Sequence, residues 1–229
     1  MGESAMANAR RMMARVGKIM LDRNLTDLAG GNISVRIDDR VLMSPSYAGT
    51  RKFWELKYED VLVLDLDGKL LEGDGKISRE MPVHLKLLNS FYPGGSAVIH
   101  SHARNIMVFC AACRPIPPVL EYCYKFGEIK VVEYARGGTQ SRKLAENVYA
   151  GLLGQESRIS KQAAAVIAPW HGLFAVGKDL QSTLDAVERI EVNAHCILLG
   201  ASLQGGAQGM KQSGNKLAET MKTAAGDGE

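Results

Sequence analysis

Apolar residues recur along the chain with two different periods, and each period predicts one kind of element. Over residues 5–23, and again over 180–199, apolar positions recur at helical spacing, which predicts amphipathic helices. Residues 33–37 instead alternate apolar and polar side chains, which predicts a strand with one buried face. An Asp-Asp turn follows and leads into a returning strand at 41–43. The N-terminal part should therefore contain a helix followed by a β-hairpin.

The rest of the chain mixes the same two patterns without an internal repeat or a linker. Further strands are predicted at residues 61–66, 97–99, 129–134, 163–168 and 173–176, and further helices at 82–91, 104–113 and 141–153. Residues 1–203 are therefore expected to form a single α/β domain. Residues 204–229 are rich in Gly, Lys, Gln and Ala, a composition typical of a mobile tail.

Composition and charge narrow the class of protein. At 229 residues, with 46% hydrophobic and 23% charged residues, the chain has the make-up of a soluble globular domain. Its net charge of +3, without a block of Lys and Arg, argues against a nucleic-acid partner. No apolar stretch approaches the roughly 18 residues of a membrane span, and residues 1–15 lack the apolar core of a signal peptide. We therefore expect a cytoplasmic protein without a membrane partner.

Two histidines stand at the end of a predicted strand. His100 and His102 directly follow the apolar run at 97–99, and side chains at i and i+2 of a strand point to the same face. His171 lies in a similar place, between the last two predicted strands. Three imidazoles at strand ends are typical of a catalytic zinc site that leaves one position open. Taken alone, the His-x-His pair is more typical of polar residues at a strand exit.

Three short polar motifs have the composition of anion-binding loops. Residues 30–32 (Gly-Gly-Asn) precede a strand, residues 44–46 (Ser-Pro-Ser) follow its returning partner, and residues 78–80 (Ser-Arg-Glu) precede the helix at 82–91. Exposed backbone amides, hydroxyls and a helix N-terminus all favour negatively charged groups. Each motif also has a structural interpretation: a glycine turn, the end of a hairpin, and a helix cap at Ser78.

The cysteines and the bulky residues near the histidines have structural interpretations. Cys110 and Cys113 have the C-x-x-C spacing of some zinc and redox sites, but no second such pair exists, and both are expected on or near the apolar face of a helix. Trp170, directly before His171, is expected to pack against its neighbours. His84, one helical turn after Glu80, either supports that carboxylate or lies on the face of its own helix.

Taken together, the motifs occur in an order that resembles a known family. Gly-Asn-Ile-Ser, Ser-Pro-Ser, Ser-Arg-Glu before a helix, His-Ser-His and a final His-Gly resemble the class II aldolase/adducin family over residues 5–200. Within it, the chain looks most like the zinc-dependent ketose-1-phosphate aldolases of the fuculose-phosphate type. The resemblance implies a three-layer α/β/α domain with a mainly antiparallel central sheet. It also implies a homotetramer with its active sites at subunit interfaces.

The resemblance implies a role for each motif. His100, His102 and His171 match the family's zinc ligands, and Glu80 matches the acidic residue that completes the resting metal site and acts as a base. Zinc would act as a Lewis acid toward the substrate's oxygens, and Mn²⁺ and Co²⁺ remain alternatives for such a site. The positions that match the family's phosphate-binding residues are Gly31, Asn32, Ser46 and Ser78.

Three departures from the family's pattern concern the substrate. Tyr47 stands where the family has glycine, and its ring would narrow the phosphate pocket. Arg79 replaces a second serine, and arginine binds phosphate or carboxylate with two parallel hydrogen bonds. The proton-donating tyrosine of the family aligns with Glu121, and Tyr122 follows directly, so either residue is a candidate for that role.

We therefore expect a metal-dependent lyase that cleaves a ketose 1-phosphate, of the fuculose, ribulose or 5-substituted ribulose type, into dihydroxyacetone phosphate and an aldehyde through an enediolate. A glutamate at position 121 instead resembles the methylthioribulose-phosphate dehydratases of the same superfamily, which lack an acid at the position of Glu80. A dehydratase, decarboxylase or epimerase acting on a related sugar phosphate or sugar acid is thus the alternative among enzymes. A non-catalytic scaffold, as in the adducin branch, is the alternative from another class.

Overall fold

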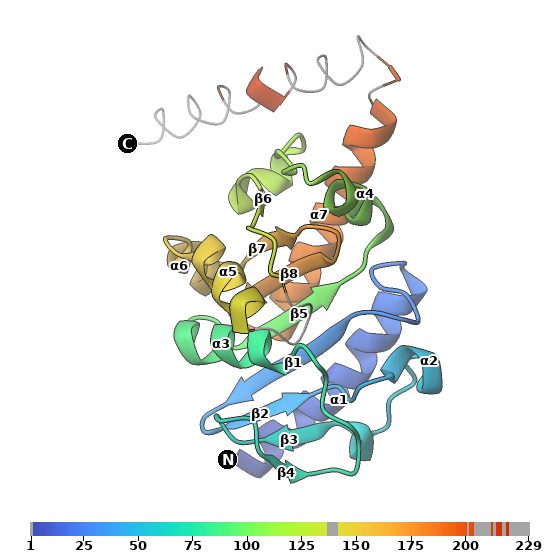
Figure 1. Cartoon of the computed structure of the whole chain (residues 1–229), viewed down its shortest axis with the longest axis vertical. Helices are drawn as coiled ribbons and strands as arrows, with labels where there is room; N and C mark the ends of the chain where they lie inside the picture. Colours follow the sequence, from blue (N-terminus) through green and yellow to red (C-terminus); the bar gives the residue numbers. More distant parts are fainter. Residues whose placement is uncertain are drawn as a thin grey trace.

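Eight strands, counted over the described residues, form one sheet in the middle of the molecule (Figure 1). The structure, a computed structural model, describes residues 2–136, 142–200, 202–203, 212, 214–216 and 219. The strands are β1 (Asn32–Ile37), β2 (Arg40–Met43), β3 (Leu62–Leu64), β4 (Leu70–Glu72), β5 (Ala97–Ser101), β6 (Lys130–Val131), β7 (Ala163–Ala168) and β8 (Gly172–Gly177). They follow the spatial order β4-β3-β2-β1-β5-β8-β7-β6, and each neighbouring pair is antiparallel except β6 and β7.

Helices cover both faces of this sheet. The helices α1 (Gly2–Asp22), α4 (Arg104–Ala112) and α7 (Leu180–Gly200) pack on one face. The helices α3 (Met81–Phe91), α5 (Arg142–Leu152) and α6 (Glu156–Lys161) pack on the other. Shorter helical segments lie in the connections: α2 (Ala48–Lys52) and the 3-10 helices η1 (Tyr58–Asp60) and η2 (Glu121–Phe126). The three-layer arrangement that the resemblance implies is confirmed.

The sheet has a hydrophobic core on each face, and the alternation of side chains along a strand decides which of the two faces a residue meets. This alternation determines the position of His100. Along β5, Ala97 and Ile99 belong to the core that α1 and α7 cover, whereas Val98 belongs to the core that α3 covers. Successive side chains of a strand point to opposite faces. His100 therefore lies on the α3 side of the sheet, near the first turn of that helix, where Glu80 stands.

Two predicted strands are shorter in the structure. The strand predicted at 61–66 ends one residue before Asp65, because the carboxylate of Asp65 accepts two backbone N–H groups of the following turn, at 3.0 and 2.8 Å. The strand predicted at 129–134 is reduced to the two residues of β6, and Ile129 pairs with Ile116 in an isolated bridge instead. Local hydrogen bonds thus override the apolar pattern at both places.

The other predicted elements are present and differ from their predicted bounds by three residues or fewer. Residue 141, where one helix was predicted to begin, and most of residues 204–229 lie outside the described residues. No prediction covered β4, α2, η1, η2 or α6. The side chains of β4 are all exposed, so this edge strand has no buried face and leaves no periodic signal in the sequence.

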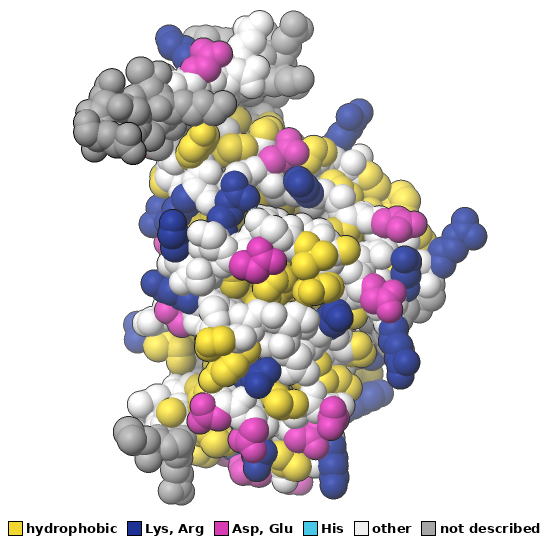
Figure 2. All heavy atoms as spheres, turned by 90° about the vertical axis from the view of Figure 1, so that its left-hand side faces the viewer, with side chains coloured by type: hydrophobic (Ala, Val, Ile, Leu, Met, Phe, Trp, Pro, Cys, Tyr) yellow, Lys and Arg dark blue, Asp and Glu magenta, His cyan; other side chains and the backbone are white. Residues whose placement is uncertain are grey.

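Charged side chains of both signs lie on the surface (Figure 2), and two of the cysteines lie on or beside α4. Figure 2 shows Lys and Arg side chains interspersed with Asp and Glu over the face that it presents. None of the described helices has both the length and the apolar character needed to cross a membrane. Cys110 belongs to α4 and its side chain is buried in the core, and this burial raises the pKa of its thiol to about 12. Its interpretation as a small buried hydrophobe is confirmed, whereas Cys113 is only partly buried, and both thiols are free.

Candidate active site

Three histidines meet where the end of β5 lies beside the start of β8. His100 belongs to β5, His102 follows that strand directly, and His171 immediately precedes β8. The two strands are antiparallel neighbours with His100 opposite Phe174, so the end of one strand adjoins the beginning of the other. One ring nitrogen from each histidine can be chosen so that the three atoms lie within 4.8 Å of one another. The structure thus brings together the three histidines that the sequence singles out.

Hydrogen bonds behind two of the rings leave their inner nitrogens free. Nδ1 of His100 lies 2.9 Å from the backbone oxygen of Leu173. A carbonyl oxygen only accepts, so Nδ1 carries the proton and Nε2 carries the lone pair. Nδ1 of His102 lies 3.4 Å from Oδ2 of Asp27, which favours the same tautomer. The two Nε2 atoms then face each other at 3.0 Å as two acceptors, an arrangement that a shared cation would satisfy.

Glu80 closes the remaining side of this cluster. It directly precedes α3 and is 8% exposed. Its Oε1 lies 2.8 Å from Nε2 of His171, and its Oε2 lies 3.6 Å from Nε2 of His100. Nδ2 of Asn32 donates a short hydrogen bond to Oε2. Burial by itself would raise the pKa of Glu80, but the two imidazoles and the Asn32 amide together lower it below its ordinary value, so the carboxylate is ionised.

These donors fit a divalent metal ion. Burial lowers the pKa of His100 well below its ordinary value of 6.5, so its ring is neutral, which is the form that binds a cation. Nε2 of His171 is buried and makes no hydrogen bond, although it lies close to Glu80. Three imidazoles and one carboxylate are ligands that suit zinc and related ions. The backbone of Leu173 and the carboxylate of Asp27 hold two of the rings from behind, as is usual around bound metals.

A polar cavity of about 160 Å³ opens beside Glu80, His102 and His171. Its walls come from the loop before β1, the loop after β2 and the segment before α3, which are far apart in the sequence. They contain the residues that the sequence assigns to an anionic group: Gly31, Asn32, Ser46, Tyr47, Ser78 and Arg79. The three polar motifs and the histidine cluster therefore form one site.

Glycine is required where the first loop meets the histidines. A Cβ atom on Gly30 would lie 1.9 Å from Nδ1 of His102. Gly31 has a φ of +83°, in the left-handed region, and a Cβ atom there would lie 2.3 Å from Oγ1 of Thr26. The backbone approaches the cavity closely because neither residue has a side chain.

Backbone contacts hold the serine hydroxyls of the cavity in place. Oγ of Ser46 donates to the backbone oxygen of Ile77 at 2.9 Å. Oγ of Ser78 lies 3.2 Å from Nδ2 of Asn32 and 3.2 Å from the backbone nitrogen of Glu80, and it accepts from both. Of the two interpretations of Ser78, the helix cap is not observed, because the helix begins directly after Glu80 and has no side-chain cap. Ser78 ties the cavity wall to Glu80 and Asn32 instead.

Basic and aromatic side chains surround the mouth of this cavity. Tyr47 has a φ of +65°, a conformation that glycine adopts readily and bulky residues rarely do. The guanidinium of Arg51 lies 4.5 Å from the centre of the Tyr47 ring, and the ammonium of Lys76 lies 6.0 Å from it. Lys76 also lines the cavity together with Arg79. No motif pointed to Lys76 or Arg51, because a single basic residue in a polar segment carries no distinctive pattern.

His84 lies behind Glu80, between α3 and the sheet. It is fully buried, and its Nδ1 lies 2.6 Å from Oγ of Ser34 on β1. Burial lowers its pKa from 6.5 to about 4, so the ring is neutral near pH 7. Of its two sequence interpretations, the structure favours a supporting position under the Glu80 turn. His195, by contrast, is exposed on α7.

Glu121 and Tyr122 do not reach the histidine cluster within one chain. Both lie on η2 and line a separate cavity of about 520 Å³, together with Tyr124 and Lys125. The guanidinium of Arg189 lies 5.0 Å from the centre of the Tyr122 ring. Burial raises the pKa of Tyr122 above its ordinary value. The structure of a single chain therefore places these two candidates outside the polar cavity.

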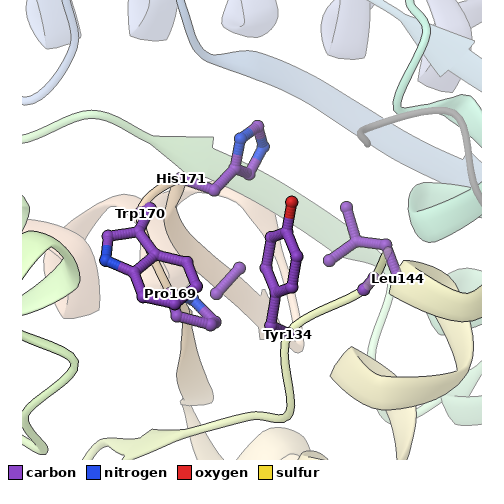
Figure 3. A pocket seen from close by; sticks show the side chains of 7 residues that line it. Tyr134, Leu144, Pro169, Trp170 and His171 are labelled. Carbon is purple, nitrogen blue, oxygen red and sulfur yellow. The ribbon is translucent and has the colours of Figure 1, made fainter. Parts of the chain in front are cut away.

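A third cavity, of about 370 Å³, adjoins His171 on the side away from the polar cavity (Figure 3). Its walls are Tyr134, Ala135, Leu144, Ala168, Pro169, Trp170 and His171. Trp170, which was expected to pack, does so at the surface: its side chain is 62% exposed, and its ring meets the Tyr134 ring edge-on at 5.1 Å. Trp170 has a φ of +58° in the turn between β7 and β8, and this conformation directs the indole away from the core.

Comparison with known proteins identifies the family. The model of the class II aldolase and adducin N-terminal domain matches residues 11–198. The chain therefore belongs to the class II aldolase/adducin family, and membership of this family supports a lyase activity.

Curated relatives act on sugar phosphates. The chain is 30% identical over 194 residues to a 3-oxo-tetronate 4-phosphate decarboxylase of Haemophilus influenzae, which covers 81% of this chain and 84% of the relative. It is 28% identical over 184 residues to a 5-deoxy-D-ribulose 1-phosphate aldolase of Bacillus thuringiensis, which covers 80% of each. Among solved structures, an L-fuculose 1-phosphate aldolase superimposes with a TM-score of 0.75 at 24% identity, over 92% of this chain and 96% of that one. This last likeness concerns the fold.

Proposed function

We propose that the chain is a metal-dependent aldolase that cleaves a ketose 1-phosphate into dihydroxyacetone phosphate and an aldehyde. The observation that carries the proposal is the position of Glu80, which contacts His100 and His171 and borders a cavity lined by anion-binding groups. A buried, ionised carboxylate beside a metal site suits proton transfer at an enolising carbon. The curated relatives that cleave deoxyribulose and fuculose phosphates support the same substrate class.

The polar cavity is where the phosphate would bind. The Ser78 hydroxyl accepts from Asn32 and from the Glu80 backbone, so its own hydrogen is free to bond the phosphate, and Lys76 and Arg79 offer positive charge. Charge-assisted hydrogen bonds of this kind are roughly twice as strong as neutral ones. Binding there would fix the phosphate and leave the next carbons of the ketose beside Glu80 and the histidines.

The histidines and Glu80 would have two roles in the reaction: to hold the metal ion and to transfer a proton. His100, His102 and His171, with Glu80, would hold a divalent ion, with zinc the best match to the donors. The bound ion supplies Lewis acidity toward the ketone oxygen. Cleavage breaks the bond between C3 and C4: the C4 hydroxyl loses its proton and becomes the aldehyde carbonyl, while the electron pair of the bond stays on C3 as an enediolate. Glu80 would return a proton to C3, which gives dihydroxyacetone phosphate.

The C4 hydroxyl needs its own acid–base group, and we propose that Glu121 or Tyr122 of a neighbouring subunit provides it. Within one chain these residues lie on η2, outside the polar cavity. A homotetramer with active sites between subunits, as the family resemblance implies, would bring η2 of one subunit to the histidine cluster of the next.

A decarboxylase is the second candidate, and the Haemophilus influenzae relative favours it. In a 3-oxo acid that carries a 4-phosphate, loss of CO₂ leaves its electron pair on C2, next to the ketone. The resulting enediolate is that of dihydroxyacetone phosphate, and protonation at the same carbon gives the same product. The half of the site built from Glu80 and the histidines serves both reactions. The two candidates differ only in whether an aldehyde or CO₂ departs.

Hydrogen exchange into dihydroxyacetone phosphate tests the shared half-reaction. The zinc-loaded chain is incubated with this compound in deuterated water without an aldehyde, and exchange at the hydroxymethyl carbon is followed by NMR. Stereospecific exchange that requires the metal supports the proposal. Addition of aldehydes then separates the two candidates, since only an aldolase forms a ketose 1-phosphate. No exchange by a metal-loaded protein would overturn both candidates and favour a dehydratase, an epimerase or a scaffold.

A further inference from the structure

The cavity formed by Tyr134, Leu144, Pro169 and Trp170, here called the aromatic cavity, takes no part in the steps above. We propose that it binds an apolar substituent on the aldehyde half of the substrate. The proposal rests on the proposed aldolase function and specifies its substrate class: ketose 1-phosphates whose far end carries an alkyl group in place of hydroxyl groups.

The position of the aromatic cavity relative to the histidine cluster supports this assignment. His171 lines both the aromatic cavity and the polar cavity, and no other described residue that lines one also lines the other. Its imidazole contacts Glu80 at 2.8 Å. A ketose with its phosphate in the polar cavity and its reacting carbons at this cluster would extend its far end past His171. That far end is the part that departs as the aldehyde.

The chemistry of the walls identifies the kind of group that fits. Leu144, Ala135 and Ala168 form a buried apolar floor, with 5%, 5% and 1% exposure. Among the described residues that line the cavity, none is Asp, Glu, Lys or Arg. A hydroxylated chain would lose water there and regain few hydrogen bonds, whereas an alkyl chain would gain by leaving water. The cavity volume of about 370 Å³ leaves room for several carbon atoms.

The two aromatic residues at the rim are arranged for contact with a ligand. Figure 3 shows the Tyr134 hydroxyl pointing to the side on which His171 lies, with Trp170 and Leu144 on either side of the ring. Tyr134 is 51% exposed, so both rings present apolar surface that a ligand would cover. The backbone of Trp170 has the left-handed conformation, which is rare for a bulky residue.

One turn fixes both the indole and the imidazole. The backbone nitrogen of Trp170 donates to the oxygen of Cys110 at 3.0 Å, and that of His171 donates to the oxygen of Ala168 at 3.2 Å. These two hydrogen bonds hold the turn between β7 and β8. The wall of the aromatic cavity and a proposed metal ligand are therefore positioned together.

The test measures how the rate of aldol addition depends on the aldehyde. The zinc-loaded full chain is given dihydroxyacetone phosphate and, in turn, acetaldehyde, propanal, butanal or pentanal. Burial of each methylene should raise kcat/KM by about fourfold until the cavity is full. Propanal should also be preferred over glyceraldehyde, which has the same carbon chain with hydroxyl groups, by roughly tenfold or more.

Three variants locate the effect. Trp170→Ala and Tyr134→Ala should each flatten the dependence on chain length, and Tyr134 is distant in sequence from the proposed ligands. Phe53→Ala is the matched control and should keep the wild-type dependence: Phe53 is an aromatic residue with 58% exposure and a φ of +51°, and it lines neither cavity. The dependence on chain length is a ratio of the rates that one protein preparation shows with different aldehydes, so a partial loss of metal affects all these rates equally and cancels.

Hydrogen exchange into dihydroxyacetone phosphate, measured on the same samples, separates the two ways in which the proposal would fail. If exchange occurs but the wild-type rate does not rise with chain length, or rises equally in the two cavity variants, the aromatic cavity does not bind the aldehyde substituent. If exchange itself is absent from the metal-loaded wild type, the aldolase function fails, and the substrate class fails with it.

Discussion

The two cavities that share His171 are built in opposite ways. The polar cavity is assembled from three short motifs, each rich in Gly, Ser, Asn or Arg, and it is small, at about 160 Å³. The aromatic cavity is larger, at about 370 Å³, and its walls come from residues 134–135, 144 and 168–171, which carry no polar motif. A reaction common to many relatives needs one fixed arrangement of polar groups, whereas the departing fragment differs between substrates. The contrast suggests that chemistry and specificity lie on opposite sides of one histidine.

The cavities nevertheless have one feature in common. Each has an aromatic residue in the left-handed conformation at its rim, Tyr47 at the polar cavity and Trp170 at the aromatic one. Bulky residues rarely adopt this conformation. The guanidinium of Arg51 lies over the Tyr47 ring, and the backbone nitrogen of Trp170 donates a hydrogen bond to the backbone oxygen of Cys110.

Removal of a proposed metal ligand should have the largest effect. In His100→Ala, zinc binding should be lost and exchange into dihydroxyacetone phosphate should fall by about 10³-fold or more, because a Lewis-acid metal contributes several kcal/mol to such a step. Metal analysis, exchange NMR and circular dichroism measure the three properties. His195→Ala, at an exposed position on α7, is the control and should resemble the wild type. A His100→Ala protein that keeps stoichiometric zinc would remove His100 from the site.

Glu80→Gln should have the next largest effect. The amide cannot carry the proton, so exchange should slow by roughly 100-fold or more while the three imidazoles still bind the metal. The measurement is the exchange rate per bound zinc. Wild-type exchange in this variant would show that another group transfers the proton.

Arg79→Ala tests whether the polar cavity alone recognises the phosphate. Loss of a charge-assisted hydrogen bond should raise the KM for dihydroxyacetone phosphate by about tenfold, with little change in the dependence on aldehyde length. The control is Lys178→Ala, since Lys178 follows the end of β8 that is remote from His171. A change in aldehyde preference without a change in KM would contradict the division between the two cavities.

His84→Gln should produce the smallest effect, visible only as pH dependence of stability. The folded pKa of His84, about 4, lies below the ordinary value of 6.5. The unfolded chain therefore binds a proton first as pH falls, and stability present above pH 6.5 is lost between pH 6.5 and 4. At pH 5 the contribution lost is about 2 kcal/mol.

Urea unfolding of the metal-free wild type and of His84→Gln at pH 7 and pH 5 measures this difference. The wild type should lose about 2 kcal/mol more than the variant between the two pH values. Equal losses would mean that His84 is not held neutral under the Glu80 turn.

The sequence singles out the residues that meet at the polar cavity because they form motifs. His100 and His102 follow an apolar run, and the glycines at 30 and 31 occur where a side chain would collide with His102 or Thr26. The strand near Asp65 was predicted too long because a side-chain hydrogen bond ends it. A periodic pattern records burial and does not record such local competition.

The aromatic half could not be found in the same way. Tyr134 and Trp170 are isolated in the sequence and meet only through the packing of the β7–β8 turn, and an apolar residue such as Trp170 is by default assigned to the core. Glu121 and Tyr122 present a different difficulty, since one chain leaves them in a separate cavity. In the proposed mechanism their role depends on assembly, which the periodicity of one chain does not encode.

The central claim is that His100 of β5, His102 directly after that strand, and His171 before β8 hold a metal ion between the two cavities. X-ray absorption at the zinc edge of the zinc-loaded chain tests it most directly. The account predicts three imidazole nitrogens at about 2.0–2.1 Å, together with oxygen ligands. A spectrum that requires thiolate sulfur, as from Cys110 and Cys113, or that contains fewer than three imidazoles, would contradict it.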